Sequence, residues 1–334
     1  MSHPDSPRLP VPAAGTLLAK RTRLAVSTLA VVGISLVFPF PVEGRLWGHI
    51  FNLAHAPAFF CTLLAIVGLL DPSAVGLPKR FATVIPMSIS RTAAVAALLA
   101  VLGLIAEFLQ YFAGRNPNLK DVAANSGGLL AAFVWVSGQK TAGVKRYVAG
   151  LFTVLIIAVA SFTPLMNVSE CVRQLHQMPL LASFERPLEL GSWRAQNATM
   201  TRSPAWSTHG KRSLQVDLQP AQYPGVSLFW PNADWQGYQS FAIDLHNPAD
   251  RPLPLIIKIQ DREHELSGRD PRDRFRRHVL LEPGQVRNIR IAISEIRQAP
   301  ENRSMRMDQI SLVQVFTSNL KVPTTYFVDN LRLE

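Results

Sequence analysis

A group of polar residues stands inside apolar sequence in the first half of the chain. Glu107 and Gln110 lie three positions apart and Asp121 and Asn125 four apart, so each pair shares one face of a helix. Arg115 stands in the short connection between them. Ionisable groups in membrane helices are costly unless they are paired, and they mark functional sites. Two hypotheses stay open: these residues hold the two helices of a hairpin together, or they form an active or ligand-binding site.

His55, in the preceding apolar segment, is a further candidate for this group. A single membrane histidine could instead serve packing or hydrogen bonding. The group contains no nucleophile beside a general base and no recognisable set of metal ligands. No catalytic residue is therefore assigned, and although enzymatic activity stays open, a noncatalytic protein is expected.

Five apolar segments are predicted to position this group as membrane spans, each near or within the ~17–25 residues that cross the hydrocarbon core. They are Leu24–Phe40, Ile50–Leu70, Thr92–Phe112, Val122–Val136 and Val148–Leu165. The first follows basic residues and could be the apolar region of a signal peptide. Because it ends Phe-Pro-Phe-Pro without a small-x-small cleavage site, an uncleaved anchor is predicted.

The basic residues predict the orientation of these spans. With the N-terminus in the cytoplasm, three basic residues face outward (Arg45, Arg115 and Lys120). Ten face inward (Arg8, Lys20, Arg21, Arg23, Lys79, Arg80, Arg91, Lys140, Lys145 and Arg146). Since cytoplasmic loops carry the excess of Lys and Arg, this orientation is favoured. An odd number of spans then places the second half of the chain outside the cytoplasm.

Charge is distributed unevenly between the two halves of the 334-residue chain. Residues 1–167 hold 13 Lys and Arg against 5 Asp and Glu, a net charge of +8, whereas residues 168–334 hold 21 against 18, a net charge of +3. This excludes a single soluble globule. It also argues against a nucleic-acid partner, because the excess charge flanks apolar segments. The two cysteines, Cys61 and Cys171, are expected to be unpaired.

The polar group resembles the signature of VanZ-like membrane proteins. Their pattern is Glu-x-x-Gln, Arg, Asp-x-x-x-Asn and small residues, with an upstream histidine that Asn52-Leu-Ala-His55 supplies. The resemblance covers roughly residues 24–165. It implies a membrane protein without an established biochemical activity and suggests an association with cell-envelope polysaccharides.

The second half of the chain has the period-two pattern of β-strands. The expected strands are Leu214–Leu218, Val226–Trp230, Phe241–Leu245, Leu255–Ile259, Arg277–Leu281, Ile289–Ile293, Ile310–Phe316 and Thr325–Leu333. Turn signals separate them, such as His209-Gly210 and Pro283-Gly284. Eight or nine short strands in about 150 residues predict an all-β antiparallel sandwich of the jelly-roll type. The expected fold is thus an α-helical membrane bundle followed by this sandwich.

Alternation in the last strand places Asp329 in one row with Phe327, Leu331 and Leu333. A buried carboxylate needs a partner. Calcium bound by Asp329 and Glu185 is one hypothesis. Hydrogen bonds from backbone N–H groups to Asp329 are the other.

Four sequence pieces resemble carbohydrate-binding modules. They are Phe184-Glu185, Gly210-Lys-Arg-Ser213-Leu-Gln-Val216, Asp234-Trp235-x-x-Tyr238 and Val328-Asp329-Asn-Leu-Arg-Leu333. Their order is similar to the galactose-binding-like sandwich of family 11 modules and of complex I intermediate-associated domains, over residues 180–334. The resemblance implies noncatalytic glycan or protein binding and a structural calcium at Glu185 and Asp329.

Sugar binding needs flat apolar faces beside directional polar groups. The candidate ligand-binding residues are Trp206, Trp230, Asp261, His264, Arg274 and Arg276. The arginines would suit an acidic or phosphorylated polymer, although a solvated charged loop explains them equally. Trp235 and Tyr238 flank a strand and are expected in the core.

The expected organisation is a cytoplasmic tail (1–23), a transmembrane domain (24–167), a linker (168–182) and an extracytoplasmic sandwich (183–334). The leading hypothesis is a multi-pass protein of the cytoplasmic membrane whose sandwich tethers or senses an envelope polysaccharide. A membrane enzyme acting through Glu107, Arg115 and Asp121 on an envelope or lipid-linked substrate is an alternative. A structural protein that binds envelope partners is a third.

Overall fold

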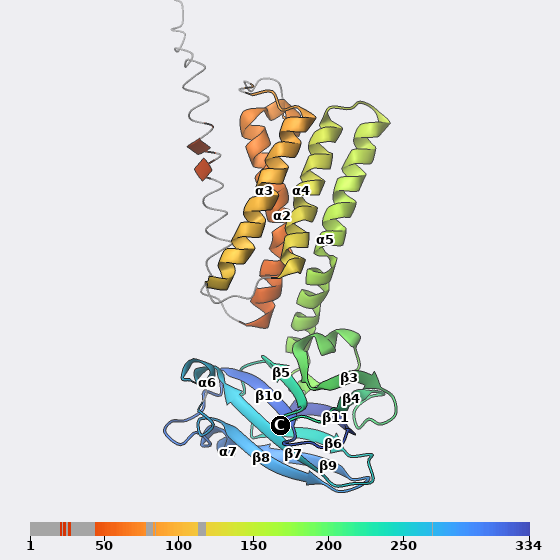
Figure 1. The fold of residues 1–334 in the computed structure, drawn as a ribbon, viewed down its shortest axis with the longest axis vertical. Helices are drawn as coiled ribbons and strands as arrows, with labels where there is room; N and C mark the ends of the chain where they lie inside the picture. The colour runs from red at the N-terminus through yellow and green to blue at the C-terminus, as the bar shows by residue number, and fades with distance from the viewer. Residues whose placement is uncertain are drawn as a thin grey trace, which may run out of the picture. The chain divides into compact units, whose positions relative to one another are not determined.

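The computed structural model describes residues 21, 23, 24, 26, 27, 44–77, 83, 85–112, 118–268 and 270–334. The chain divides into two compact units, Met1–Met166 and Asn167–Glu334 (Figure 1). Nearly all of the first expected span, Leu24–Phe40, lies outside the described residues, as does Arg115. The segment 168–182, expected above as a linker, contains the last turns of a helix and the first strand.

The first unit is helical. Its helices are α2 (Arg45–Leu70), the 3₁₀ turn η1 (Pro72–Val75), α3 (Ile89–Phe112), α4 (Leu119–Gln139) and α5 (Val144–His176), which continues into the second unit. Three of them, α2, α3 and α5, are long and apolar enough to cross a membrane. Among the described residues α4 does not meet that criterion, so five spans are not confirmed.

The outward faces of α3 and α5 are apolar. Leu98, Val101 and Phe108 on α3 and Leu151 and Val154 on α5 are each more than half exposed. Exposed apolar surface on this scale is unfavourable in water and favourable in hydrocarbon. The helical unit therefore has the surface expected of a membrane domain.

Helix α4 packs closely against α2 because small residues line their contact. A Cβ atom built on Gly128 would lie 2.1 Å from the backbone oxygen of Ala56 on α2, a separation that real atoms do not reach. Ala131 and Ala132, one turn further along, are fully buried. Small residues at such contacts let two helix backbones approach each other. This close approach sets the position of α4 relative to α2.

The second unit is a β-sandwich with two antiparallel sheets. Its strands are β1 (Leu180–Ala182), β2 (Trp193–Gln196), β3 (Ala198–Ser203), β4 (Ser213–Leu218), β5 (Gly225–Phe229), β6 (Ser240–His246), β7 (Leu253–Asp261), β8 (Phe275–Leu281), β9 (Val286–Ala292), β10 (Ile310–Phe316) and β11 (Thr324–Leu333). One sheet has the order β3-β4-β11-β6-β9, with β1 beside β11, and the other has the order β2-β5-β10-β7-β8. The short helices η2 (Pro187–Ser192), α6 (Arg262–Leu266) and α7 (Ile293–Arg297) connect strands.

The topology confirms the predicted jelly roll. The eight strands β4 to β11 form two four-stranded arrays, β4-β11-β6-β9 and β5-β10-β7-β8, as the two Greek keys of this fold require. All eight strands expected from the sequence are present. Strands β1, β2 and β3 were missed, since β1 and β2 have three and four residues and β3 is largely polar.

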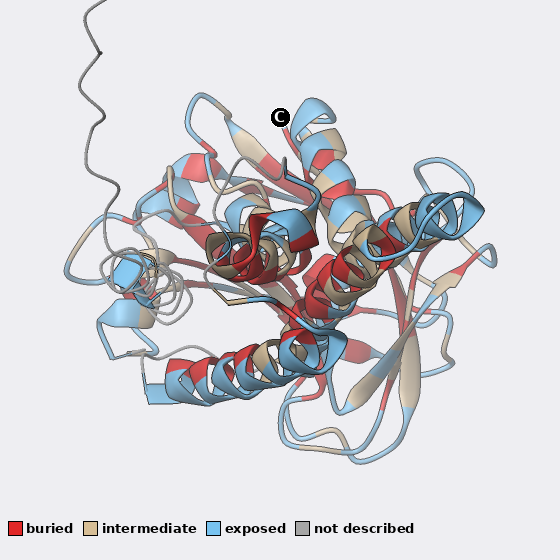
Figure 2. Cartoon of the chain, turned by 90° about the horizontal axis from the view of Figure 1, so that it is seen from above, coloured by how far each residue is buried: buried red, intermediate tan, exposed pale blue. Residues whose placement is uncertain are grey.

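The sandwich core lies between the two sheets. Its centre includes Trp193, Trp235 and Tyr326, each at most 2% exposed, so the expectation that Trp235 belongs to the core is confirmed. Figure 2 shows buried residues gathered where elements pack together and exposed residues on their outer sides. Because successive strand residues point to opposite faces, the residues between core positions form the outer faces of the sheets.

A β-bulge in β11 interrupts the alternation of inward and outward side chains that the sequence predicted. Tyr326 and Val328 face the core before the bulge, and Leu331 and Leu333 face it afterwards. The pairing of β11 with β6 shifts between Asp329 and Arg332, and Asn330 has a φ of 52°, which Asn tolerates better than most residues. The prediction that Asp329 shares one row with Leu331 was therefore wrong, because the extra residue inverts the alternation.

Replacing Gly128 by alanine tests the close approach of α4 and α2. The added methyl group should cost about 1–3 kcal/mol of stability, because the backbone of α2 cannot move aside without losing other contacts. The measurement is thermal unfolding of the full chain in detergent. Gly150→Ala on α5 is the matched control, because its Cβ would meet nothing within 4 Å. Equal melting temperatures for the two variants would contradict the packing described here.

Candidate functional site

A row of polar side chains crosses the outer face of the five-stranded sheet. Arg194 on β2 pairs with Ser227 on β5, which pairs with Gln314 on β10, and Gln314 pairs with Lys258 on β7, which pairs with Arg276 on β8. Their sequence neighbours, such as Val226, Val313 and Ile257, belong to the core, so the row faces outward. We call these five residues the basic row.

Apolar side chains flank the basic row on both sides. On one side Phe316 on β10 pairs with Ile256 on β7, and on the other Phe229 pairs with Leu312. Tyr223, which is 47% exposed, meets the ring of Phe316 edge-to-face at a centroid distance of 6.2 Å. Phe316 and Leu312 are themselves buried, so Tyr223 and Phe229 are the apolar side chains that this face presents beside its polar groups.

Gly225 on β5 allows Phe316 to lie beside the row. A Cβ atom at Gly225 would lie 2.4 Å from both Phe316 Cβ and the backbone oxygen of Val315. Any other residue would push β5 and β10 apart. The glycine is therefore required by the close approach of two strands that both contribute to the row.

The outer faces of the two sheets differ in charge. The basic row contains three cationic side chains and no carboxylate, and Arg274 precedes it on the chain just before β8. Burial lowers the pKa of Arg274 from its usual value, and the neighbouring charge of Arg276 lowers it further. On the other sheet Asp244 pairs directly with Asp329, and Asp217 pairs with Thr325. On that second face Arg290 and Arg332 pair with Glu334, so cations and carboxylates are mixed there, whereas the basic row holds cations without a carboxylate and would attract an anionic ligand.

The structure separates the six ligand-binding candidates predicted from the sequence. Arg276 lies in the basic row, with Arg274 close to it in sequence. Trp206 lies on the other sheet, where its ring is 5.3 Å from that of His246 and 6.0 Å from that of Phe327. Trp230 follows β5 in a left-handed conformation with a φ of 51°. The row's other members, Arg194, Ser227, Lys258 and Gln314, were missed because only strand pairing aligns them.

The remaining two candidates, Asp261 and His264, are buried at the junction of β7 and α6. Asp261 accepts hydrogen bonds from Arg303 at 2.6 and 2.8 Å and from the backbone N–H of Arg306 at 2.7 Å, and it caps α6 through the N–H of His264. Arg303 also binds Asp273 at 2.6 Å. These contacts give Asp261 a structural role as the centre of an ion-pair network.

Asp261 and His264 both have pKa values below their usual ones, for different reasons. Burial tends to raise the pKa of Asp261, but the hydrogen bonds from Arg303 and the backbone N–H groups hold it below its usual range. Burial lowers the pKa of His264, so this ring is neutral at pH 7. Because the folded-state pKa of Asp261 is depressed, its stabilisation is complete at neutral pH and is lost as the pH falls through that value.

The two carboxylates expected to bind calcium hold the same loop. Asp329 Oδ2 accepts hydrogen bonds from the backbone N–H groups of Thr208 and His209 at 2.6 and 2.9 Å. Glu185 Oε1 accepts from those of Lys211 and Arg212, both at 2.8 Å. Burial raises the pKa of Asp329 despite these bonds. Amide hydrogens, rather than the six to eight oxygens of a calcium site, face the carboxylates, so calcium here stays a prediction.

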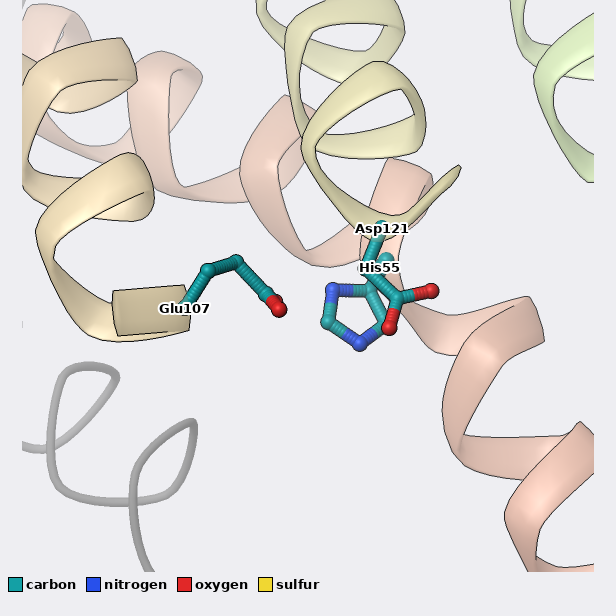
Figure 3. Close-up of side chains that lie close together, drawn as sticks. All are labelled: His55, Glu107 and Asp121. Atoms are coloured by element: carbon teal, nitrogen blue, oxygen red, sulfur yellow. The ribbon is translucent and has the colours of Figure 1, made fainter. Parts of the chain in front are cut away.

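The polar group of the helical unit is brought together by three helices. His55 on α2, Glu107 on α3 and Asp121 on α4 point toward one another, and one potential ligand atom from each lies within 4.8 Å of the others (Figure 3). Gln110 donates to Glu107 at 3.2 Å, and Asn125 Oδ1 lies 2.8 Å from His55 Nδ1. Five of the six sequence candidates therefore meet here, and the sixth, Arg115, lies outside the described residues.

No family model matches the chain, so its resemblance to VanZ-like proteins has no support from that comparison. No curated protein matches it either. Solved structures do match. A family 11 carbohydrate-binding module from Clostridium thermocellum, in complex with a beta-1,3-1,4-mixed-linked tetrasaccharide, is 16% identical, with a TM-score of 0.36 and coverage of 46% of this chain and 94% of that one.

Two further structures are similar to part of the chain. An exo-beta-agarase is 14% identical, with a TM-score of 0.37 and coverage of 46% of this chain but only 24% of its own. The chain thus spans about a quarter of that enzyme's length. A xylan-binding domain from Paenibacillus barcinonensis is 14% identical, with a TM-score of 0.33 and coverage of 46% and 94% respectively.

Replacing Arg303 by leucine tests the structural role of Asp261. The variant leaves a buried carboxylate without its main partner, which should cost about 3–5 kcal/mol of stability in the sandwich. Urea unfolding of the full chain, followed by tryptophan fluorescence, measures this cost. Arg306→Ala is the control, because it removes an exposed arginine that pairs with Asp308 at the surface. If Arg303→Leu unfolds at the same urea concentration as this control, the network has no structural role.

Chelation tests the calcium prediction. If Glu185 and Asp329 hold the ion, EGTA should lower the melting temperature of the full chain and added Ca²⁺ should restore it, because an ion that binds only the folded state stabilises that state. Asp329→Asn should remove the response to both reagents. An unchanged melting temperature with EGTA would mean that amide hydrogens alone hold the loop.

Proposed function

We propose that the sandwich binds an anionic polysaccharide without catalysis along the basic row, and that the helical unit anchors it in the cytoplasmic membrane. The observation that carries this proposal is the alignment of Arg194, Ser227, Gln314, Lys258 and Arg276 across all five strands. Strands lie about 4.8 Å apart, so the row is about 19 Å long. Ser227 is buried, but an extended polymer lying across the strands can contact the other four members at once.

The side chains of the row suit a sugar acid. The planar fork of an arginine matches the two oxygens of a carboxylate or sulfate, and a lysine adds a point charge. Gln314 offers donors and an acceptor for hydroxyl groups. Phe229 and Tyr223, which are 38% and 47% exposed, lie near these polar side chains and can cover the apolar face of a sugar ring. The absence of carboxylates from the row removes the main source of repulsion for an acidic ligand.

The proposed membrane topology places the N-terminus in the cytoplasm and the sandwich outside. Basic residues at one end of the helices support it. Arg91 lies in the first turn of α3, and Lys145 and Arg146 lie in the first turn of α5. Lys140 follows α4 and donates to the backbone oxygen of Met87, just before α3. This end has the positive charge expected of the cytoplasmic side.

Within this proposal the protein tethers or senses an envelope polysaccharide. The membrane bilayer and the glycan are its two partners. A second function, action on an envelope or lipid-linked substrate, is favoured by one observation, the convergence of His55, Glu107 and Asp121 in the helical unit.

Lys258→Ala and Arg276→Ala test the site. Each should weaken binding to an acidic polysaccharide about tenfold, a loss of about 1.4 kcal/mol, because each removes a cation from the proposed contact. Affinities are measured with the full chain in nanodiscs, against an acidic polysaccharide and a neutral one, at low and at high salt. Arg297→Ala, at the exposed end of α7, removes the same charge far from the row in sequence and is the control.

Binding of the acidic polymer should fall with rising salt, since screening weakens exposed charge contacts. Equal loss in Arg297→Ala would show a nonspecific effect of net charge. Unchanged affinity in both row variants would exclude the row as the binding site.

A further inference from the structure

We infer that His55, Glu107 and Asp121 form a binding site for a divalent transition-metal ion of the Zn²⁺ class. These residues lie 52 and 14 positions apart along the chain but come together from α2, α3 and α4 (Figure 3). One potential ligand atom from each lies within 4.8 Å of the others. Ligand bonds of about 2.0–2.2 Å would draw these atoms closer by about 1 Å.

The imidazole and one of the two carboxylates in this group are shielded from water. His55 and Glu107 are 6% and 3% exposed, and the helices around them are apolar. Two carboxylates this close repel each other, and burial in an apolar bundle increases the cost. A divalent cation offsets both charges at once while the imidazole supplies a neutral ligand. A shared ion would thus be held by two charged ligands and one neutral ligand.

A second set of side chains orients these ligands. Asn125 Oδ1 lies 2.8 Å from His55 Nδ1, and because an amide oxygen only accepts hydrogen bonds, Nδ1 carries the hydrogen. His55 Nε2 then keeps its lone pair for a metal ion. Gln110 Nε2 donates to Glu107 Oε1 at 3.2 Å and fixes that carboxylate. Metal sites in proteins use such outer partners to fix the tautomer and orientation of their ligands.

The ligand types favour a transition metal over calcium or magnesium. Calcium and magnesium prefer oxygen ligands alone, whereas imidazole nitrogen favours Zn²⁺ and related ions. Three protein ligands leave a coordination position for water or for another molecule, as in catalytic zinc sites. The site is independent of the basic row, so its test does not depend on glycan binding.

Zn²⁺ binding to the full chain in detergent, purified without a polyhistidine tag, tests this site. Competition with a chromophoric chelator should show one tightly bound Zn²⁺ per chain. His55→Ala, Glu107→Gln and Asp121→Asn should each weaken it at least tenfold, because each removes one of three ligands. Asn125→Ala should weaken binding about 10–100-fold as an outer-shell change, and Asn125→Asp should restore it because it keeps the acceptor.

His49→Ala is the matched control, since it removes a histidine from the same helix six positions before His55. It should bind Zn²⁺ as tightly as the unaltered chain. X-ray absorption of the unaltered, Zn²⁺-loaded chain needs no variant to fold, and it should show one imidazole nitrogen with carboxylate oxygens. No stoichiometric Zn²⁺, equal affinity in the three ligand variants, or a coordination shell without imidazole would each overturn the assignment.

Discussion

The pairing register of β7 is the constraint on which the proposed site depends. Lys258 pairs with Gln314 on one side and with Arg276 on the other, while Ile257 and Ile259 point into the core. A slip of one residue would turn the lysine inward and both isoleucines outward, at a cost of several buried side chains. The apolar alternation that stabilises the sandwich therefore also aligns the polar row on its outer face. Core stability and site geometry are two consequences of one register.

The same alternation places the basic row and the paired carboxylates on opposite outer faces. The basic row lies on one sheet, and Asp217 and Asp244 lie on the other, where Asp329 holds the loop from Thr208 to Arg212 with the help of Glu185. The sandwich carries only a small net charge for its size, so under the proposed function this separation favours the basic row as the site for an anionic ligand. A uniform mixture of the same charges would offer no such preference.

The sequence predicts local structure well in this chain, because helix faces and strand alternation are local properties. It places Glu107 with Gln110, Asp121 with Asn125, and eight of the eleven strands. The bulge at Asn330 was not predicted, because a single residue in a left-handed conformation leaves no periodic pattern in the sequence. After this residue the two faces of β11 are exchanged. The basic row was not predicted, because its alignment depends on which strands pair and in what register. Nonlocal packing sets both.

For the polar group of the helical unit, too, the sequence predicted the local features and not the contacts between helices. Its candidates were visible as rare polar residues in apolar sequence, but their convergence on His55 depends on the close approach of α4 to α2. That approach depends on Gly128, which lies against the backbone of Ala56. The sequence alone showed the small residues without showing which helix they meet.

Hydroxyl-radical footprinting of the full chain in nanodiscs, with and without a bound acidic oligosaccharide, tests the central claim most directly. Tyr223 and Phe229 are 47% and 38% exposed beside the basic row, whereas Trp206 lies on the opposite sheet. The account predicts that the ligand protects Tyr223 and Phe229 from oxidation and leaves Trp206 unchanged. Protection of Trp206 with no change at Tyr223 and Phe229 would place the ligand on the other face and contradict it.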